Sequence, residues 1–120
     1  MNILIVDDSR TMRMTVRRAL RQANIGTHQV EEAKNGLDAL EKLKTFSADL
    51  ILSDWNMPSL DGPGLLAAVR ATGNTWSRFG FITSQSSVES RTRAQQAGAA
   101  FLITKPFSAE DIGAAILTGR

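Results

Sequence analysis

Short apolar runs alternate with helical patterns along the chain. Four runs of apolar and β-branched residues have the length of strands, and they lie at 3–6, 50–52, 79–82 and 101–103. Continuous apolar runs are typical of parallel strands, which are buried on both faces of a sheet. A fifth segment near 27–33 is more polar, and we predict that it is an outer strand of the same sheet.

Helical patterns lie between these runs. Helices are predicted at about 9–22, 37–44, after Gly62-Pro63 (marked by Leu65, Leu66 and Val69), 88–96 and 108–117. The fourth of them has little apolar surface. Strands and helices in alternation predict right-handed βαβ crossovers and an α/β fold with a doubly wound parallel sheet. We expect one domain over residues 1–120, without a linker or repeat.

Polar residues follow each of the four strong strand candidates. Asp7 and Asp8 follow the first run and Asp54 the second. Thr83 follows the third and Lys105 the fourth. The carboxyl ends of parallel strands lie along one edge of a sheet, and α/β folds hold their ligands at that edge. We therefore expect these five side chains to converge.

The expected cluster contains three carboxylates, which repel one another. Two unit charges about 4 Å apart cost about 4 kcal/mol at an effective dielectric constant near 20. Such a cluster keeps a proton or holds a cation, and an all-oxygen site with room for water suits Mg²⁺ better than zinc. With Asp54 as a carboxylate nucleophile, Lys105 as a fixed cation and Thr83 as a hydroxyl donor, the set predicts a phosphoryl-transfer site.

Five motifs in order carry a resemblance to a known family. They are ILIVDDS at 3–9, SDWNMP at 53–58, LDG at 60–62, AGA at 97–99 and KPF at 105–107. Each motif alone is weak, but together they span essentially the whole chain. The chain resembles the receiver domains of two-component response regulators, and most of all the CheY-like chemotaxis type. The resemblance implies a flavodoxin-like (βα)5 sheet with the strand order 2-1-3-4-5.

The resemblance also implies roles for the acidic residues. Asp54 would be the phosphate acceptor, with a phosphohistidine on a sensor histidine kinase as the donor. Asp8 and Asp54 would bind Mg²⁺ together with the backbone carbonyl of Asn56, while Asp7 would act mainly through water. The chain would not be an enzyme with a separate substrate, although it would assist its own phosphorylation and dephosphorylation.

Further implications concern the lysine, the threonine and the output surface. The Lys105–Pro106 peptide bond is expected to be cis, and Lys105 and Thr83 are expected to contact the transferred phosphoryl group. Phosphorylation would switch a surface made by the fourth helix, the last strand and the last helix, which binds a downstream target protein. Asn56 and Gln85 flank the expected path of water and would influence hydrolysis of the phosphate.

The chain departs from the family at one aromatic residue, whose side-chain rotamer usually changes on phosphorylation and which usually lies three residues before the lysine. Leu102 is at that position and Phe101 precedes it. Because side chains alternate along a strand, Phe101 is expected on the opposite face of the sheet. We therefore expect Thr83 to couple to the output surface through backbone movement. Trp55, directly after the acceptor, is expected to be partly exposed.

Two features of the sequence allow a second interpretation. Asp7-Asp8 could cap the first helix, but a functional cluster is favoured because Asp54 and Lys105 are expected at the same edge of the sheet. Basic residues recur along the first predicted helix, at Arg10, Arg13, Arg17 and Arg21. They are more typical of a face exposed to solvent than of a docking surface for the phosphodonor, and we favour the first interpretation.

Two other functions on a similar fold lack their required residues. A phosphohydrolase of the haloacid dehalogenase type needs a carboxylate two residues after its nucleophile, and this chain has Asn56 there. A nucleotide or flavin binder would need a glycine-rich loop after the first strand, but the first glycine is Gly26.

Composition and charge narrow the class of protein further. The 120 residues include no cysteine, which excludes disulfides and thiolate metal sites and permits a cytoplasmic location. A net charge of +2 is too small to indicate nucleic-acid binding, and no apolar stretch approaches membrane-spanning length. The chain ends soon after the fifth helix, so a stand-alone switch is expected. The alternative is the N-terminal receiver module of a longer regulator.

Overall fold

Strands and helices alternate along the computed structural model, which describes residues 1–26, 29–84 and 87–118. The strands are β1 (Asn2–Val6), β2 (Gln29–Ala33), β3 (Leu50–Asp54), β4 (Arg78–Thr83) and β5 (Phe101–Thr104). The helices are α1 (Arg10–Ala23), α2 (Gly36–Lys42), α3 (Gly62–Ala71), α4 (Val88–Ala97) and α5 (Ala109–Thr118). The start of the second predicted strand, at 27–28, and the expected role of Gln85 lie outside the described residues.

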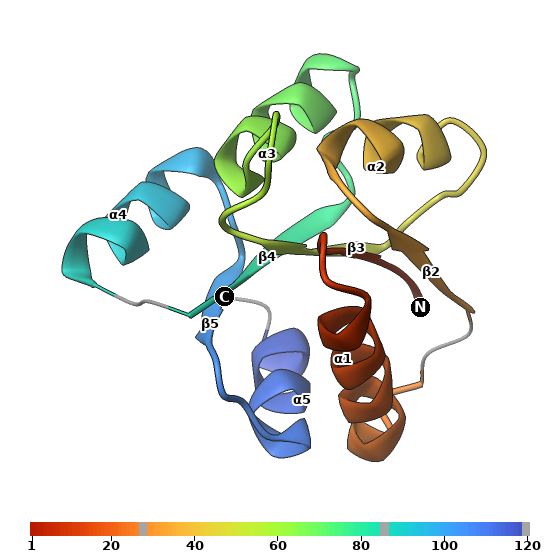
Figure 1. Cartoon of the computed structure of the whole chain (residues 1–120), viewed down its shortest axis with the longest axis vertical. Helices are drawn as coiled ribbons and strands as arrows, with labels where there is room; N and C mark the ends of the chain where they lie inside the picture. The colour runs from red at the N-terminus through yellow and green to blue at the C-terminus, as the bar shows by residue number, and fades with distance from the viewer. Residues whose placement is uncertain (27–28, 85–86, 119–120) are drawn as a thin grey trace.

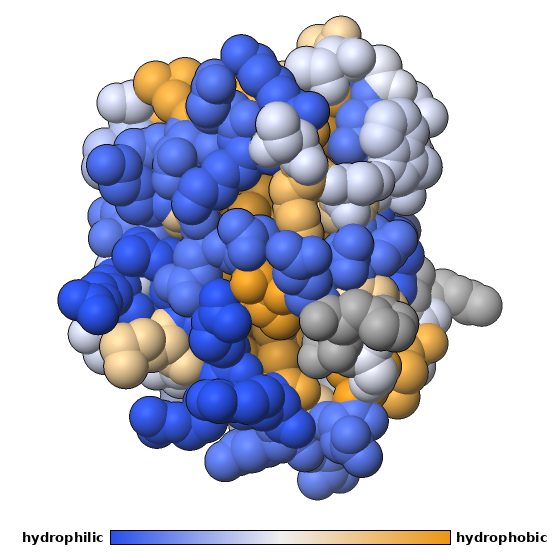
Figure 2. Space-filling model, turned by 90° about the vertical axis from the view of Figure 1, so that its right-hand side faces the viewer, coloured by the Kyte–Doolittle hydropathy of each residue, from blue (hydrophilic) through white to orange (hydrophobic). Residues whose placement is uncertain are grey.

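All strands form one parallel sheet in the order β2-β1-β3-β4-β5, which confirms the predicted flavodoxin-like topology. The polar strand β2 pairs with β1 alone and lies at an edge, as expected from its sequence. Figure 2 views the molecule from the β2 side of Figure 1, and hydrophilic residues cover most of this face. Polar side chains on an exposed edge strand discourage pairing with another chain.

Helices cover both faces of the sheet. In Figure 1, α1 and α5 lie below the sheet, while α2, α3 and α4 lie above it. Ile3 and Ile5 of β1 join the core under α1 and α5, whereas Leu4 and Val6 join the core under the other three helices. This alternation follows from the two-residue period of a strand. Full burial of each such side chain stabilises the fold by about 1.5–3 kcal/mol.

Side-chain caps set the helix starts within a residue or two of the predicted ones. The Ser9 side chain accepts a hydrogen bond from the Met12 N–H at 3.2 Å, so α1 begins at Arg10. Asn35 caps α2 in the same way, and that helix ends at Lys42 instead of the predicted residue 44. Asp61 caps α3 just before the Gly62-Pro63 pair.

The fourth helix is the most weakly anchored. Of the residues of α4, all of which are described, Ala94 alone is buried. Few buried apolar contacts are typical of elements that open or move at low free-energy cost. Within the described ranges, no helix is both long and apolar enough to cross a bilayer.

Candidate functional site

The carboxyl ends of β1 and β3 bring three carboxylates together. Val6 pairs with Ser53 in the sheet, so Asp7 and Asp54 emerge side by side from neighbouring strands. Asp7, Asp8 and Asp54 each offer a carboxylate oxygen, and these oxygens lie within 4.8 Å of one another. The convergence expected from the strand ends is therefore present.

Asp7 is buried and held on several sides. Its N–H donates to the carbonyl of Ala33 at 3.1 Å, and its Oδ1 accepts from the Ser9 N–H at 2.9 Å. Because Ser9 caps α1, the alternative that the two aspartates cap this helix is wrong. Asp8, next in the chain, is exposed and leaves one side of the cluster open to water.

Lys105 brings a positive charge from the end of β5. Its Nζ lies 3.5 Å from Oδ1 of Asp54 and 3.7 Å from Oδ2 of Asp7. Its backbone N–H donates to the carbonyl of Thr83 at 2.7 Å, which ties the lysine to the end of β4. The Lys105–Pro106 bond is cis, as expected.

One lysine does not balance the acidic cluster. Burial raises the pKa of Asp54 and of Asp7 above the ordinary value of 3.8, although the charge of Lys105 pulls both values down. Hard carboxylate oxygens with one face open to water are the donor set that Mg²⁺ prefers, because this ion usually keeps several waters. The residues present therefore fit a divalent cation of that kind.

Thr83 and Asn56 lie at the same edge of the sheet. Thr83 is the last residue of β4 and is buried, one position beyond Ile82, which pairs with Asp54. Asn56 is exposed in the loop that directly follows β3. The roles expected for the Thr83 hydroxyl and for the Asn56 backbone carbonyl stay predictions.

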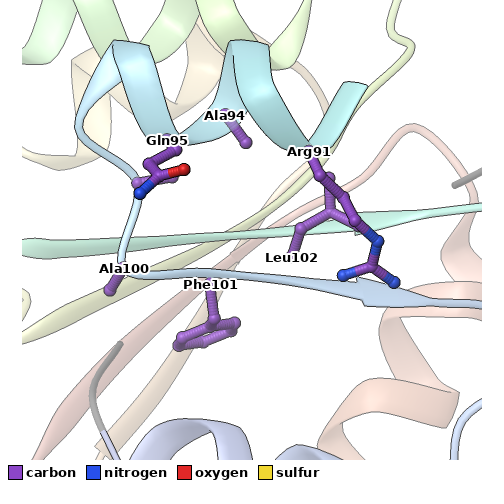
Figure 3. Close-up of a pocket in the computed structure, with 7 residues that line it drawn as sticks. Arg91, Ala94, Gln95, Ala100, Phe101 and Leu102 are labelled. Atoms are coloured by element: carbon purple, nitrogen blue, oxygen red, sulfur yellow. The ribbon is translucent and has the colours of Figure 1, made fainter. Parts of the chain in front are cut away.

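Phe101 and Leu102 point to opposite faces of β5, as predicted. Phe101 packs in the core under α1 and α5, where its ring covers Gly80 of the neighbouring strand. Leu102 packs on the α4 side, as Figure 3 shows. A pocket of about 230 Å³ lies there between β5 and α4, lined on the helix by Arg91 and Gln95. The aromatic ring of Phe101 is thus on the wrong face to act at the output surface.

Trp55 differs from its sequence-based expectation. Its side chain is only 9% exposed, because its ring packs edge-on against Phe81 with the centroids 4.8 Å apart. The guanidinium of Arg93, from α4, lies over the same ring at 5.5 Å. Nothing in the spacing of the sequence indicates this contact, which links α4 to the residue after Asp54.

The basic residues of α1 are also only partly as predicted. Arg10 and Arg21 are exposed, but Arg13 and Arg17 both form ion pairs with Glu32 of β2. A solvated face is therefore wrong for the inner pair. The only available signal was an acidic residue on a polar outer strand next to a basic helix.

Comparison with known proteins decides the family. A family model described as the response regulator receiver domain matches residues 3–117. The chain belongs to this family. The receiver is 41% identical to chemotaxis protein CheY-3 of Vibrio cholerae over 91% of this chain and 83% of that protein. It is 38% identical to a probable chemotaxis protein CheY of Rhizobium etli, over 95% and 88%.

Solved structures agree with this assignment. The receiver matches the chemotaxis protein CheY4 of Vibrio cholerae with a TM-score of 0.88 and 30% identity, over 99% of this chain and 98% of that one. The receiver domain of a putative response regulator NarL from Mycobacterium tuberculosis gives a TM-score of 0.87 at 32% identity, over 99% and 97%. The fold and the CheY-like character of the receiver are thus established together.

Proposed function

We propose that this receiver is a phosphorylation switch whose acceptor is Asp54. A phosphohistidine on a sensor histidine kinase would supply the phosphoryl group, and a downstream target protein would bind the modified form. The observation that carries the proposal is the convergence of Asp7, Asp8 and Asp54 beside Lys105 at one sheet edge. The proposal treats the chain as one cytoplasmic receiver domain, as the resemblance implies.

The transfer step uses the carboxylate of Asp54 as the nucleophile. One carboxylate oxygen forms a bond to phosphorus while the bond from phosphorus to the donor nitrogen breaks. The electron pair of that bond stays on the imidazole, which then takes up a proton. The site needs little covalent chemistry of its own, because positioning and charge stabilisation dominate phosphoryl transfer.

A magnesium ion would be held by Asp8, Asp54 and the backbone carbonyl of Asn56, with Asp7 acting through water. When bound, it would offset the repulsion between the carboxylates and the incoming phosphoryl oxygens. The raised pKa values of Asp7 and Asp54 support this assignment, because burial makes both carboxylates costly to ionise and repulsion from the neighbouring carboxylates adds to that cost.

Lys105 and Thr83 would hold the transferred group. Lys105 already lies 3.5 Å from Asp54, so its ammonium is placed to stay beside phosphoryl oxygens once the carboxylate becomes an acyl phosphate. Thr83 ends the neighbouring strand, and its hydroxyl would donate to another of these oxygens. The hydrogen bond from the Lys105 backbone N–H to the Thr83 carbonyl would couple the movements of the two residues.

The output would be a change in the surface formed by α4, β5 and α5. The weak anchoring of α4 supports this choice, because Ala94 is the one buried residue of this helix. A swing from 1:99 to 99:1 between two conformations needs about 5.5 kcal/mol of differential interaction. The chemotaxis relatives favour a target protein in a chemotaxis pathway.

Labelling by a small phosphodonor tests the proposal. With acetyl phosphate, the wild type should take up one phosphoryl group per chain, and only when Mg²⁺ is present. Asp54→Asn should abolish the label, whereas Asp8→Asn should keep the acceptor and require more Mg²⁺. Undiminished labelling of Asp54→Asn would remove Asp54 from its role. Steady hydrolysis of a phosphate monoester, which is not an acyl phosphate donor, would instead favour a hydrolase.

A further inference from the structure

Arg13 joins three elements beside the acidic cluster, and the proposed chemistry does not use it. Its Nε donates to Oε1 of Glu32, on β2, at 2.9 Å. Its Nη1 donates to the backbone carbonyl of Asp7 at 2.7 Å. The side chain is only 15% exposed, so both contacts are sheltered from competing water. A single guanidinium on α1 thus spans from the edge strand to the loop after β1.

The carbonyl that Arg13 contacts belongs to the peptide unit between Asp7 and Asp8. A peptide unit is planar from one Cα to the next, so a hydrogen bond to its oxygen restricts rotation of the whole plane. That plane sets the position of the Asp8 Cα relative to Asp7. The other hydrogen bonds of Asp7, to Ala33 and Ser9, hold its amide and its carboxylate but not this carbonyl.

Arg17 provides a natural comparison one helical turn away. Its Nε donates to the other oxygen of Glu32 at 2.9 Å, and its Nη2 donates to the carbonyl of Val30 at 3.0 Å. It therefore shares the carboxylate and the charge of Arg13, but its backbone contact is to Val30 and not to Asp7. Burial alone would raise the pKa of Glu32, but the hydrogen bonds and charges of Arg13 and Arg17 together lower it.

We propose that Arg13 is a positioning residue that fixes the peptide between Asp7 and Asp8 for cation binding. The inference deepens the proposed function and rests on it, since it concerns the same metal site. Glu32 orients the guanidinium fork, and the fork presents Nη1 to the Asp7 carbonyl. Outer-shell partners of this kind typically change metal affinity by about 10- to 100-fold.

A positioning role and a purely electrostatic role of Arg13 predict opposite effects of its removal on the affinity for Mg²⁺. Arg13 is a cation near acidic ligands, so its removal would strengthen Mg²⁺ binding if charge alone mattered. If Arg13 positions the ligands, its removal weakens binding. The direction of the change therefore separates the two roles without any assumption about its size.

The test is the Mg²⁺ affinity of the full chain, measured by isothermal titration calorimetry. Arg13→Ala should weaken binding about 10-fold or more. Arg13→Lys should also weaken it, because an ammonium lacks the rigid fork that reaches Glu32 and the carbonyl together. Arg17→Ala, which removes the same charge from the same carboxylate, should stay within about twofold of the wild type.

Thermal unfolding separates positioning from a merely structural role. A structural role would lower the Tm of Arg13→Ala and leave the Mg²⁺ affinity of the folded protein unchanged, and this result would overturn the proposal. Tighter binding by Arg13→Ala would overturn it as well. If this variant does not fold, Glu32→Gln must weaken binding for the proposal to stand. A wild type that binds no Mg²⁺ would contradict the proposed function itself, whereas equal binding by wild type and Arg13→Ala refutes this inference alone.

Discussion

Replacing Lys105 with methionine removes the positive charge beside the acidic cluster while keeping a side chain that is long and unbranched. The ammonium lies 3.5 Å from Asp54 and 3.7 Å from Asp7, whose side chains are 13% and 5% exposed. At an effective dielectric constant near 20, each attraction is about 4–5 kcal/mol. The lysine regains much of this amount as hydration in the unfolded chain, so the net effect is smaller.

We expect Lys105→Met to lose about 3 kcal/mol of stability at pH 7 without Mg²⁺. Removing one partner of a buried ion pair typically costs about 3–5 kcal/mol, and uptake of a proton by the remaining carboxylates keeps the loss near the lower value. Urea unfolding followed by circular dichroism at fixed ionic strength measures this loss. Lys44→Met is the matched control, since its pair with Glu41 is 70% and 72% exposed and should be worth less than about 1 kcal/mol.

The pH dependence gives the sign of the effect. Burial raises the pKa of Asp7 and Asp54, so the folded state binds protons more readily than the unfolded chain. These two groups should therefore make the metal-free protein more stable as the pH falls from neutrality toward 3.8, which is the ordinary pKa of an aspartate side chain. The loss in Lys105→Met should shrink over the same range, and Mg²⁺ should reduce it too. A loss below about 1 kcal/mol, or one that does not change with pH, would refute this electrostatic account.

Three further outcomes follow from single contacts. Protonation of Glu32 below its ordinary pKa of 4.5 should remove its stabilising ion pairs with the two arginines. In Glu32→Gln, the free energy of unfolding measured in urea should therefore fall less steeply as the pH drops below 4.5. Gly80→Ala should lower the free energy of unfolding by about 1–3 kcal/mol, because the added Cβ would overlap the Phe101 ring, and a double-mutant cycle with Phe101→Leu should recover part of the loss. In a Trp76→Phe background, which leaves Trp55 as the one tryptophan, Arg93→Ala should alter the emission and Arg91→Ala should not; equal spectra would count against the cation–π contact.

The fold and the acidic cluster were predictable because both depend on short-range patterns. Apolar runs such as 50–52 identify buried parallel strands, and the residue that follows each run must lie at the carboxyl edge of the sheet. Asp54 and Lys105, far apart in sequence, could therefore be placed together without knowledge of any contact. The alternation of Phe101 and Leu102 was predictable for the same reason, since the period of a strand is two.

Long side chains and cross-strand contacts could not be predicted. The pairing of Arg13 with Glu32 depends on how α1 lies along the edge strand and on the direction in which each side chain turns. Trp55 was expected to be partly exposed, but Phe81 and Arg93 cover it from a neighbouring strand and from α4. The fit of Phe101 over Gly80 depends on the register of β4 and β5, which no local pattern contains.

Borohydride trapping of the phosphorylated protein tests the central claim most directly. Sodium borohydride reduces an acyl phosphate to an alcohol, which converts a phosphorylated aspartate into homoserine, and tandem mass spectrometry locates the converted residue. After treatment with acetyl phosphate and Mg²⁺, we predict homoserine at position 54 and at no other aspartate. Conversion of Asp7 or Asp8, with Asp54 intact, would contradict the account.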